Sequence, residues 1–288
     1  MEKQRESIGE VLKHLRKERQ LTQKMLAADI CAQSVISRVE NNEELPNVIV
    51  LHQICERLNI TVDQLMLTLP KNTSPMDTHF QGIYNHFIQR NYVEVAKLLE
   101  APKLLETLYL ETDLQLYYYY LGSCEFFVEK NYAAAIQSLR KGFSYTYNQD
   151  KILVSTIEIQ MMSCLGQVLK VSGQREKALK KLEKSYQFVE KLPLERKTFE
   201  LIKVYYHYGE ILYEEKKNQE ALKVVSRGLL LVQQFCSYYY LEELYYLKGL
   251  ILKKLAHENE AADYFSLAKR LKGISMVKSV EHLDFKKE

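Results

Sequence analysis

The chain has 288 residues, 47% of them hydrophobic, which predicts about two globular domains with sizeable cores and excludes a disordered tail. The net charge is only +3, with 40 Lys and Arg against 37 Asp and Glu, so bulk charge gives no sign of a nucleic-acid partner. Only 10 Gly and 5 Pro occur, and the apolar residues recur at helical spacing. We therefore expect a nearly all-α protein.

Cysteine usage and the N-terminus bear on the cellular compartment. The five cysteines are odd in number and scattered, without CxxC spacing: Cys31, Cys55, Cys124, Cys164 and Cys236. This pattern predicts neither a disulfide framework nor a zinc site, and suits a reducing environment. The N-terminus is charged and unlike a signal peptide, and no run of about 18 apolar residues follows. We expect a cytoplasmic protein without a membrane partner.

The first 70 residues carry the apolar spacing of five short helices. We expect them to begin at residue 8, after a Thr22 cap, near Gln33, after an Asn47 cap and after a Thr61 cap. Two short helices joined by a tight turn place the second one in a DNA major groove. Residues 1–70 contain 9 Lys and Arg against 10 Asp and Glu, a net −1, so DNA binding must depend on individually placed residues.

Motif residues and their spacing identify this region more closely. They are Leu21-Thr22-Gln23-Lys24, Leu26-Ala27, Gln33-Ser34, Ile36-Ser37-Arg38-Val39-Glu40-Asn41, Leu45-Pro46 and Leu58-Asn59-Ile60. Together they resemble the Xre/Cro repressor family over the whole domain, 1–69. Asn42 stands where that family often has glycine, a difference we expect to be harmless because Asn tolerates a left-handed conformation.

The resemblance implies which residues meet DNA. Gln33, Ser34 and Ser37 would present polar groups to base edges, since Gln pairs bidentately with adenine, and Val35 would meet a thymine methyl. Gln23, Lys24 and Arg38 would contact phosphates, Gln23 with help from the helix dipole. Two alternatives stay open: Ser37 and Arg38 are ordinary surface residues, and Arg16 with Glu40 forms a structural ion pair rather than a DNA contact.

Turn-forming residues cluster at 70–75, which we interpret as a linker to a second domain, 76–288. There, a glycine is followed by an alanine 12 residues later in three units, starting at Gly166, Gly209 and Gly249. A longer copy starts at Gly122, and a fainter one spans 76–101. The pattern resembles the tetratricopeptide repeat, in which small residues let two helices approach closely, although the unit exceeds the usual roughly 34 residues.

Such repeats stack into a right-handed superhelix whose first helices line a concave groove suited to a peptide. Carrying the concave positions onto this chain nominates Tyr119, Ser123, Phe126, Gln160, Ser163, Gln167, Lys170, Lys203, Tyr206, His207, Glu210, Tyr213, Tyr246 and Lys253. Lys170 or Lys203 would bind a terminal carboxylate, or else lie on a solvated face. The alternative for most of the 21 tyrosines is packing between helices, for His207 a structural role, and for the cysteines core packing.

Nothing in the sequence nominates an enzyme. Glycine-rich phosphate loops, a nucleophile elbow and HExxH are all missing from the 288 residues, so we expect no catalytic residues, no cofactor and no metal.

The two halves together resemble the PlcR-type peptide-sensing quorum regulators of Gram-positive bacteria, related to Rgg, NprR and PrgX. The resemblance implies a homodimer on a palindromic operator in double-stranded DNA, and a short signalling peptide in the repeat groove that changes the placement of the reading heads. The linker 70–75 would be the hinge. Three alternatives remain: a ligand-independent dimeric repressor, a regulator controlled by a protein partner on the repeats, and a scaffold without a transcriptional role.

Overall fold

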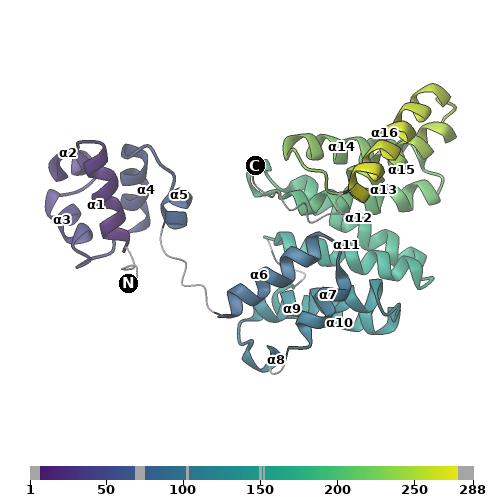
Figure 1. Ribbon diagram of the computed structural model, residues 1–288, viewed down its shortest axis with the longest axis horizontal. Coiled ribbons are helices and arrows are strands. Elements are labelled where there is room, and N and C mark those ends of the chain that lie inside the picture. The colour runs from purple at the N-terminus through teal and green to yellow at the C-terminus, as the bar shows by residue number, and fades with distance from the viewer. Residues whose placement is uncertain (1–6, 69–74, 102–103, 149–150, 152, 278–288) are drawn as a thin grey trace, which may run out of the picture. The chain divides into compact units, whose positions relative to one another are not determined.

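A computed structural model describes residues 7–68, 75–101, 104–148, 151 and 153–277 of the chain (Figure 1). Helices are the only regular secondary structure in these ranges, which confirms the all-α prediction. The chain divides into two compact units, Met1–Thr78 and His79–Glu288. The predicted linker 70–75 lies outside the described residues except for Pro75, where α6 begins. Within the described ranges, no helix has the length and apolarity that crossing a membrane requires.

The first unit consists of five helices: α1 (Ile8–Glu18), α2 (Gln23–Ala27), α3 (Gln33–Glu40), α4 (Val48–Arg57) and α5 (Val62–Thr68). Local side-chain chemistry sets their ends, as the sequence predicts. The Thr22 hydroxyl accepts from the Met25 amide at the start of α2, and Asn47 accepts from two amides at the start of α4. After α3, Asn42 adopts the left-handed conformation, with φ of 60°.

The five helices enclose one apolar core. Its fully buried members come from every helix and include Leu12, Leu26, Ile36, Ile54 and Leu65. α2 and α3 pack against each other, while α1 contacts α3 and α5. The core therefore holds α3 by its inner side and leaves its outer side to solvent.

The second unit, to which all but the first four residues of α6 belong, is a row of helical hairpins. Its helices are α6 (Pro75–Ile88), α7 (Tyr92–Leu99), α8 (Leu104–Thr107), α9 (Glu111–Phe127), α10 (Tyr132–Thr146), α11 (Thr156–Val171), α12 (Arg175–Lys191), η1 (Leu194–Arg196), η2 (Phe199–Leu201), α13 (Ile202–Glu214), α14 (Asn218–Gln234), α15 (Leu241–Lys254) and α16 (Glu258–Val277). Helices α9 and α10, α11 and α12, α13 and α14, and α15 and α16 form the packed pairs (Figure 1). The four strongest predicted repeats are thus four helical hairpins.

A glycine in the first helix of each hairpin faces a large side chain of the second. A Cβ added to Gly166 would lie 2.6 Å from Cγ of Leu182, closer than any real Cβ contact. The same contact recurs with similar distances between Gly122 and Leu139, Gly209 and Val225, and Gly249 and Phe265. The predicted role of the repeat glycines in close helix approach is therefore confirmed.

We expect Gly166→Ala to destabilise the protein by about 1–3 kcal/mol, because the added methyl must displace Leu182 in a close-packed seam. Gly82 is the matched control: it lies in α6 with no atom within 4 Å of an added Cβ. Gly82→Ala should stabilise by up to about 1 kcal/mol through helix propensity alone. Urea denaturation of both variants, monitored by circular dichroism, checks this. Equal changes in the free energy of unfolding would contradict the role of Gly166 in close helix approach.

Candidate DNA-reading helix and candidate ligand cluster

Helix α3 presents its predicted base-reading residues on the outer side of the first unit. Gln33, Ser34 and Arg38 are exposed, and Ser37 is half-buried. Val35 is partly buried against the core, so only part of its side chain is free to meet a base. Its predicted thymine contact, like the other DNA contacts, stays a prediction.

A buried ion pair fixes α3 against α1. Nε of Arg16 lies 2.5 Å from Oε1 of Glu40, and the second guanidinium nitrogen donates to Oε2 at 2.9 Å. Arg16 also donates to the Leu21 carbonyl before α2, at 2.7 Å. Burial by itself raises the pKa of Glu40, but hydrogen bonds from Arg16 and Gln23, together with the positive charges of Arg16 and Lys13, outweigh it and leave that pKa lowered. The predicted structural pair of Arg16 and Glu40 is confirmed.

The ion pair extends to the surface through two amides. The Gln23 side chain donates to Glu40 at 2.9 Å and accepts from the Gln33 side chain at 2.7 Å. The side-chain amide of Gln33 keeps its oxygen and its second N–H hydrogen free for a ligand. These are the two groups that a bidentate contact with adenine requires. The buried pair thus orients the residue predicted to read the bases.

Around this relay lies a shallow hollow of about 800 Å³ that includes the N-terminus of α2, with Gln23, Lys24 and Gln33 in its lining. Arg38 is engaged elsewhere, in a half-exposed ion pair with Glu44 at 2.6 Å. A phosphate contact by Arg38 would replace that carboxylate, while Lys24 is exposed.

In the second unit, predicted groove residues from α9, α11 and α13 meet in a buried polar group, here called the inner cluster: Tyr119, Gln160, Ser163, Lys203 and His207. The Lys203 ammonium donates to the Tyr119 hydroxyl at 2.6 Å and to Oε1 of Gln160 at 2.8 Å. Residues that are 43 and 84 positions apart in the chain are thereby joined.

Lys203 is a buried cation, only 5% exposed. No carboxylate among the described residues lies within 4 Å of it, and Glu200, which lines the same cavity, attracts it only from a greater distance. The aromatic rings of Phe87 and Tyr119 lie 5.5 and 5.3 Å from its nitrogen. Burial lowers the pKa of Lys203 to about 8, so the ammonium persists near neutral pH at a cost in stability.

Beside it, His207 is buried between two hydroxyls. Its Nδ1 lies 2.8 Å from Ser163 Oγ, and its Nε2 lies 3.3 Å from the Tyr240 hydroxyl. Burial, followed by the nearby cations Lys203 and Lys170, lowers the pKa of His207 well below its ordinary value. The imidazole is therefore neutral and keeps one acceptor and one donor nitrogen.

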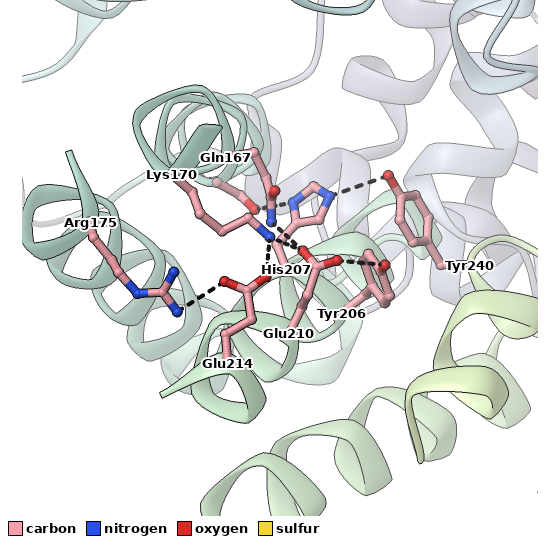
Figure 2. Close-up of polar contacts among 9 residues, drawn as sticks. Gln167, Lys170, Arg175, Tyr206, His207, Glu210, Glu214 and Tyr240 are labelled. Atoms are coloured by element: carbon pink, nitrogen blue, oxygen red, sulfur yellow. Dashed lines mark hydrogen bonds and ion pairs between the residues drawn. The ribbon is translucent and has the colours of Figure 1, made fainter. Parts of the chain in front are cut away.

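Next to His207 of the inner cluster lies an ion-pair network around Lys170, drawn in Figure 2. Lys170 lies between Glu210 and Glu214, with its nitrogen 3.1 Å from Glu214. Gln167 and Tyr206 both donate to Glu210, at 3.3 and 2.9 Å. The charge of Lys170 is therefore already matched, whereas that of Lys203 is not.

The end of α6 and the start of α7, residues 84–92, close over the inner cluster and are here called the α6–α7 corner. Phe87 packs its ring 5.1 Å from that of Tyr119. Arg90 forms an ion pair with Glu243 and lies 4.0 Å from the Tyr240 ring centre. The Tyr84 hydroxyl donates to Glu200 at 2.6 Å.

The cavity left between the α6–α7 corner and the inner cluster measures about 30 Å³ and is lined by Phe87, Tyr119, Gln160 and Lys203, among others. That volume holds roughly one or two water molecules. In this form the cavity beside Lys203 has no room for a peptide.

Five predicted groove residues belong neither to the inner cluster nor to the ion-pair network around Lys170. Ser123 is fully buried and donates to the Tyr119 carbonyl of its own helix. Phe126 packs among the rings of Phe127 and Tyr132. Tyr246 is 54% exposed and packs against Phe265 beside a separate hollow. The remaining two are half-buried Tyr213 and exposed Lys253.

Sequence reasoning missed the α6–α7 corner and Glu243. Glu243 carried a usable signal, because it lies six residues before the repeat glycine Gly249, as Gln160 lies before Gly166 and Lys203 before Gly209. Tyr84, Phe87 and Arg90 carried none, because they lie 2, 5 and 8 residues after Gly82, offsets that no predicted groove residue has from its own repeat glycine.

Both units resemble known proteins. Residues 12–65 match the helix-turn-helix family model. Bacillus thuringiensis PlcR, solved with the peptide PapR7 and DNA, superposes with a TM-score of 0.69 at 21% identity, covering 94% of this chain and 97% of that one. The chain therefore has a helix-turn-helix domain at residues 12–65 and, over most of its length, the fold of PlcR. No curated protein matches it in sequence.

The PlcR fold is shared with other regulators. The Streptococcus dysgalactiae pheromone receptor Rgg2 matches with a TM-score of 0.60 at 17% identity, covering 95% of this chain and 97% of that one. ComR from S. thermophilus, solved with DNA and its signalling peptide, matches with a TM-score of 0.53 at 16% identity, covering 95% of this chain and all of the other. The predicted resemblance to PlcR-type regulators is confirmed at the level of fold.

We expect Arg16→Met to destabilise the first unit by about 3–5 kcal/mol at pH 7, because Glu40 is left buried without its cation. In the wild type, the lowered pKa of Glu40 contributes stability above the unfolded value of about 4.3, and that contribution is lost as the pH falls further. In the variant, protonation of Glu40 removes the unpaired buried charge. The difference in unfolding free energy between wild type and Arg16→Met should therefore become smaller as the pH falls toward 4.

Hydrogen exchange of α1 and α3 amides in the full chain, measured in urea between pH 4 and 7, tests this. Arg38→Met is the control, since its half-exposed pair with Glu44 should contribute less than about 1 kcal/mol. If the difference in unfolding free energy between Arg16→Met and wild type did not change with pH, the role given to Glu40 would be contradicted.

Proposed function

We propose that the protein is a sequence-specific DNA-binding transcription regulator controlled by a short signalling peptide bound at the inner cluster. The observation that carries the proposal is the buried Lys203 ammonium, which lies among polar side chains from three successive hairpins without a carboxylate partner in the described residues. The solved complexes of PlcR and ComR with peptide and DNA support it by analogy of fold.

For DNA, the proposal assigns base reading to Gln33, Ser34, Ser37 and part of Val35. Phosphate contacts come from Gln23, Lys24 and Arg38, since the exposed cations and the start of α2 lie at the α2–α3 face. Two copies of the chain, as a homodimer, would read the two halves of a palindromic operator.

For the peptide, the proposal assigns the terminal carboxylate to Lys203 rather than Lys170. Lys170 is already matched by Glu210 and Glu214. A carboxylate beside Lys203 would complete a buried ion pair, which contributes more than an exposed one when its geometry and hydrogen bonds are good.

A peptide can reach Lys203 only if the α6–α7 corner moves, because the present cavity of about 30 Å³ excludes it. Binding would separate Phe87 from the ammonium and break the contact of Arg90 with Glu243. Because α6 follows the linker 70–75 directly, its displacement would alter the segment that leads to the reading head. The energy for switching is the difference in peptide affinity between the two arrangements.

The closed cavity also favours a second candidate, a dimeric repressor that needs no ligand. A regulator controlled by a protein partner on the repeats is a variant of it. Short synthetic peptides encoded by reading frames beside the gene, titrated calorimetrically into the purified full chain, separate these candidates. Peptide binding that changes operator affinity supports the proposal. Operator binding, weakened by Gln33→Ala, that is unchanged by every such peptide favours the repressor.

For a peptide that binds, we expect its C-terminal amide to bind at least about tenfold more weakly at pH 7, because the amide cannot form the ion pair with Lys203. Affinity of the acid form should fall by up to about tenfold per pH unit above 8, where Lys203 of the free protein is neutral. The amide should show a flat profile between pH 7 and 9. Calorimetry measures both, and identical affinities would exclude Lys203 as the carboxylate site.

We expect Arg90→Ala to strengthen peptide binding by roughly 5- to 30-fold, since removing the ion pair with Glu243 and the contact with Tyr240 destabilises the closed form by about 1–2 kcal/mol. Hydrogen exchange in α6 should accelerate in the same variant. Arg227→Ala, which breaks an ion pair with Glu190 away from the inner cluster, is the control. Unchanged affinity in Arg90→Ala would show that the α6–α7 corner does not compete with the peptide.

A further inference from the structure

A further hollow lies between α10 and α12, on residues that the proposed function does not use. It is a groove of about 640 Å³, and its floor includes Leu165 and Leu169 of α11. Both leucines are buried. None of the residues that line it belongs to the inner cluster or the α6–α7 corner.

The groove collects five cations, here called the basic groove residues: Arg140, Lys177, Lys180, Lys181 and Lys184. No acidic side chain lines it among the described residues, and none of the five forms an ion pair with a described carboxylate. Burial lowers the pKa of Lys181, and so does repulsion by Lys184 and Arg140. Like charges held together at this spacing destabilise the free protein, and an anion would relieve the repulsion.

Aromatic rings hold two of these cations in place. Lys181 lies 5.7 Å from the Phe143 ring centre, and Lys184 lies 5.7 Å from those of Tyr147 and Phe188. The rings of Phe143 and Tyr147 pack together at 4.3 Å. The groove therefore combines an apolar floor with fixed positive charges along one side.

We propose that this groove docks an acidic, amphipathic segment of a partner protein. Four of the cations, Lys177, Lys180, Lys181 and Lys184, follow the i, i+3, i+4, i+7 spacing along one side of α12 and extend over roughly 10 Å. A single phosphate spans much less, whereas carboxylates at helical spacing match the row, and apolar side chains of the same segment match Leu165 and Leu169. Lysines already lie over the Phe143 and Tyr147 rings, which disfavours stacking of nucleic-acid bases there.

The test uses the full chain and a fluorescein-labelled peptide of about 16 residues, roughly four helical turns, with Glu at i, i+3, i+4 and i+7 beside a row of Leu. Anisotropy titrations compare it with a scrambled peptide of the same composition. We expect saturable binding of the ordered peptide, and at least a tenfold loss in Lys181→Glu with Lys184→Glu. Lys216→Glu with Lys223→Glu, exposed lysines outside the groove with the same change in net charge, should leave binding unchanged.

Lys181→Gln with Lys184→Gln is the conservative variant, and circular dichroism of each variant confirms that it is folded. The proposal is overturned in favour of general charge attraction if both charge-reversed double variants lose affinity for the ordered peptide equally. Equal binding of the scrambled and the ordered peptide overturns it in the same way. Tighter binding of inorganic triphosphate or a single-stranded oligonucleotide than of the peptide overturns it in favour of a phosphate ligand. These outcomes are independent of whether any peptide binds at Lys203.

Discussion

Each of the four packed hairpins from α9 to α16 depends on a glycine of its first helix that touches a large side chain of its second, as Gly166 touches Leu182. Without a Cβ between them, the two helices approach closely, and this contact sets the rotation of the first helix. Side chains six residues before the glycine then recur on one side of successive first helices. Gln160, Lys203 and Glu243 all occupy that position, and all three contact either one another or the α6–α7 corner.

This arrangement buries the positive charge of Lys203, which contributes little to the stability of the fold. A buried ammonium loses its hydration, and Lys203 recovers two neutral hydrogen bonds and two ring contacts in exchange, without an ion pair within 4 Å among the described residues. The α6–α7 corner shields the charge instead of neutralising it. A site that is stable when closed yet incomplete in charge is suited to a ligand that brings a carboxylate, which is why the closed cavity and the proposed peptide site are compatible.

Most of the first unit could be predicted from the sequence. Its caps at Thr22 and Asn47 and its left-handed turn at Asn42 depend on interactions within a few residues, which local sequence patterns report directly. The pair of Arg16 and Glu40 joins residues 24 positions apart, and the family resemblance supplied it. The relay through Gln23 to Gln33 could not be predicted, because it depends on how α1, α2 and α3 pack together.

For the second unit, the sequence by itself determined the hairpins, their glycine contacts and the polar character of the first helices, because each follows from periodicity within one repeat. Only the tertiary structure decided that these polar residues lie beneath the α6–α7 corner. The bonds of Tyr84 to Glu200 and Arg90 to Glu243 join residues 116 and 153 positions apart. Contacts at such separation follow from the curvature of the whole row of hairpins, a sum of many packing contacts that no local pattern encodes.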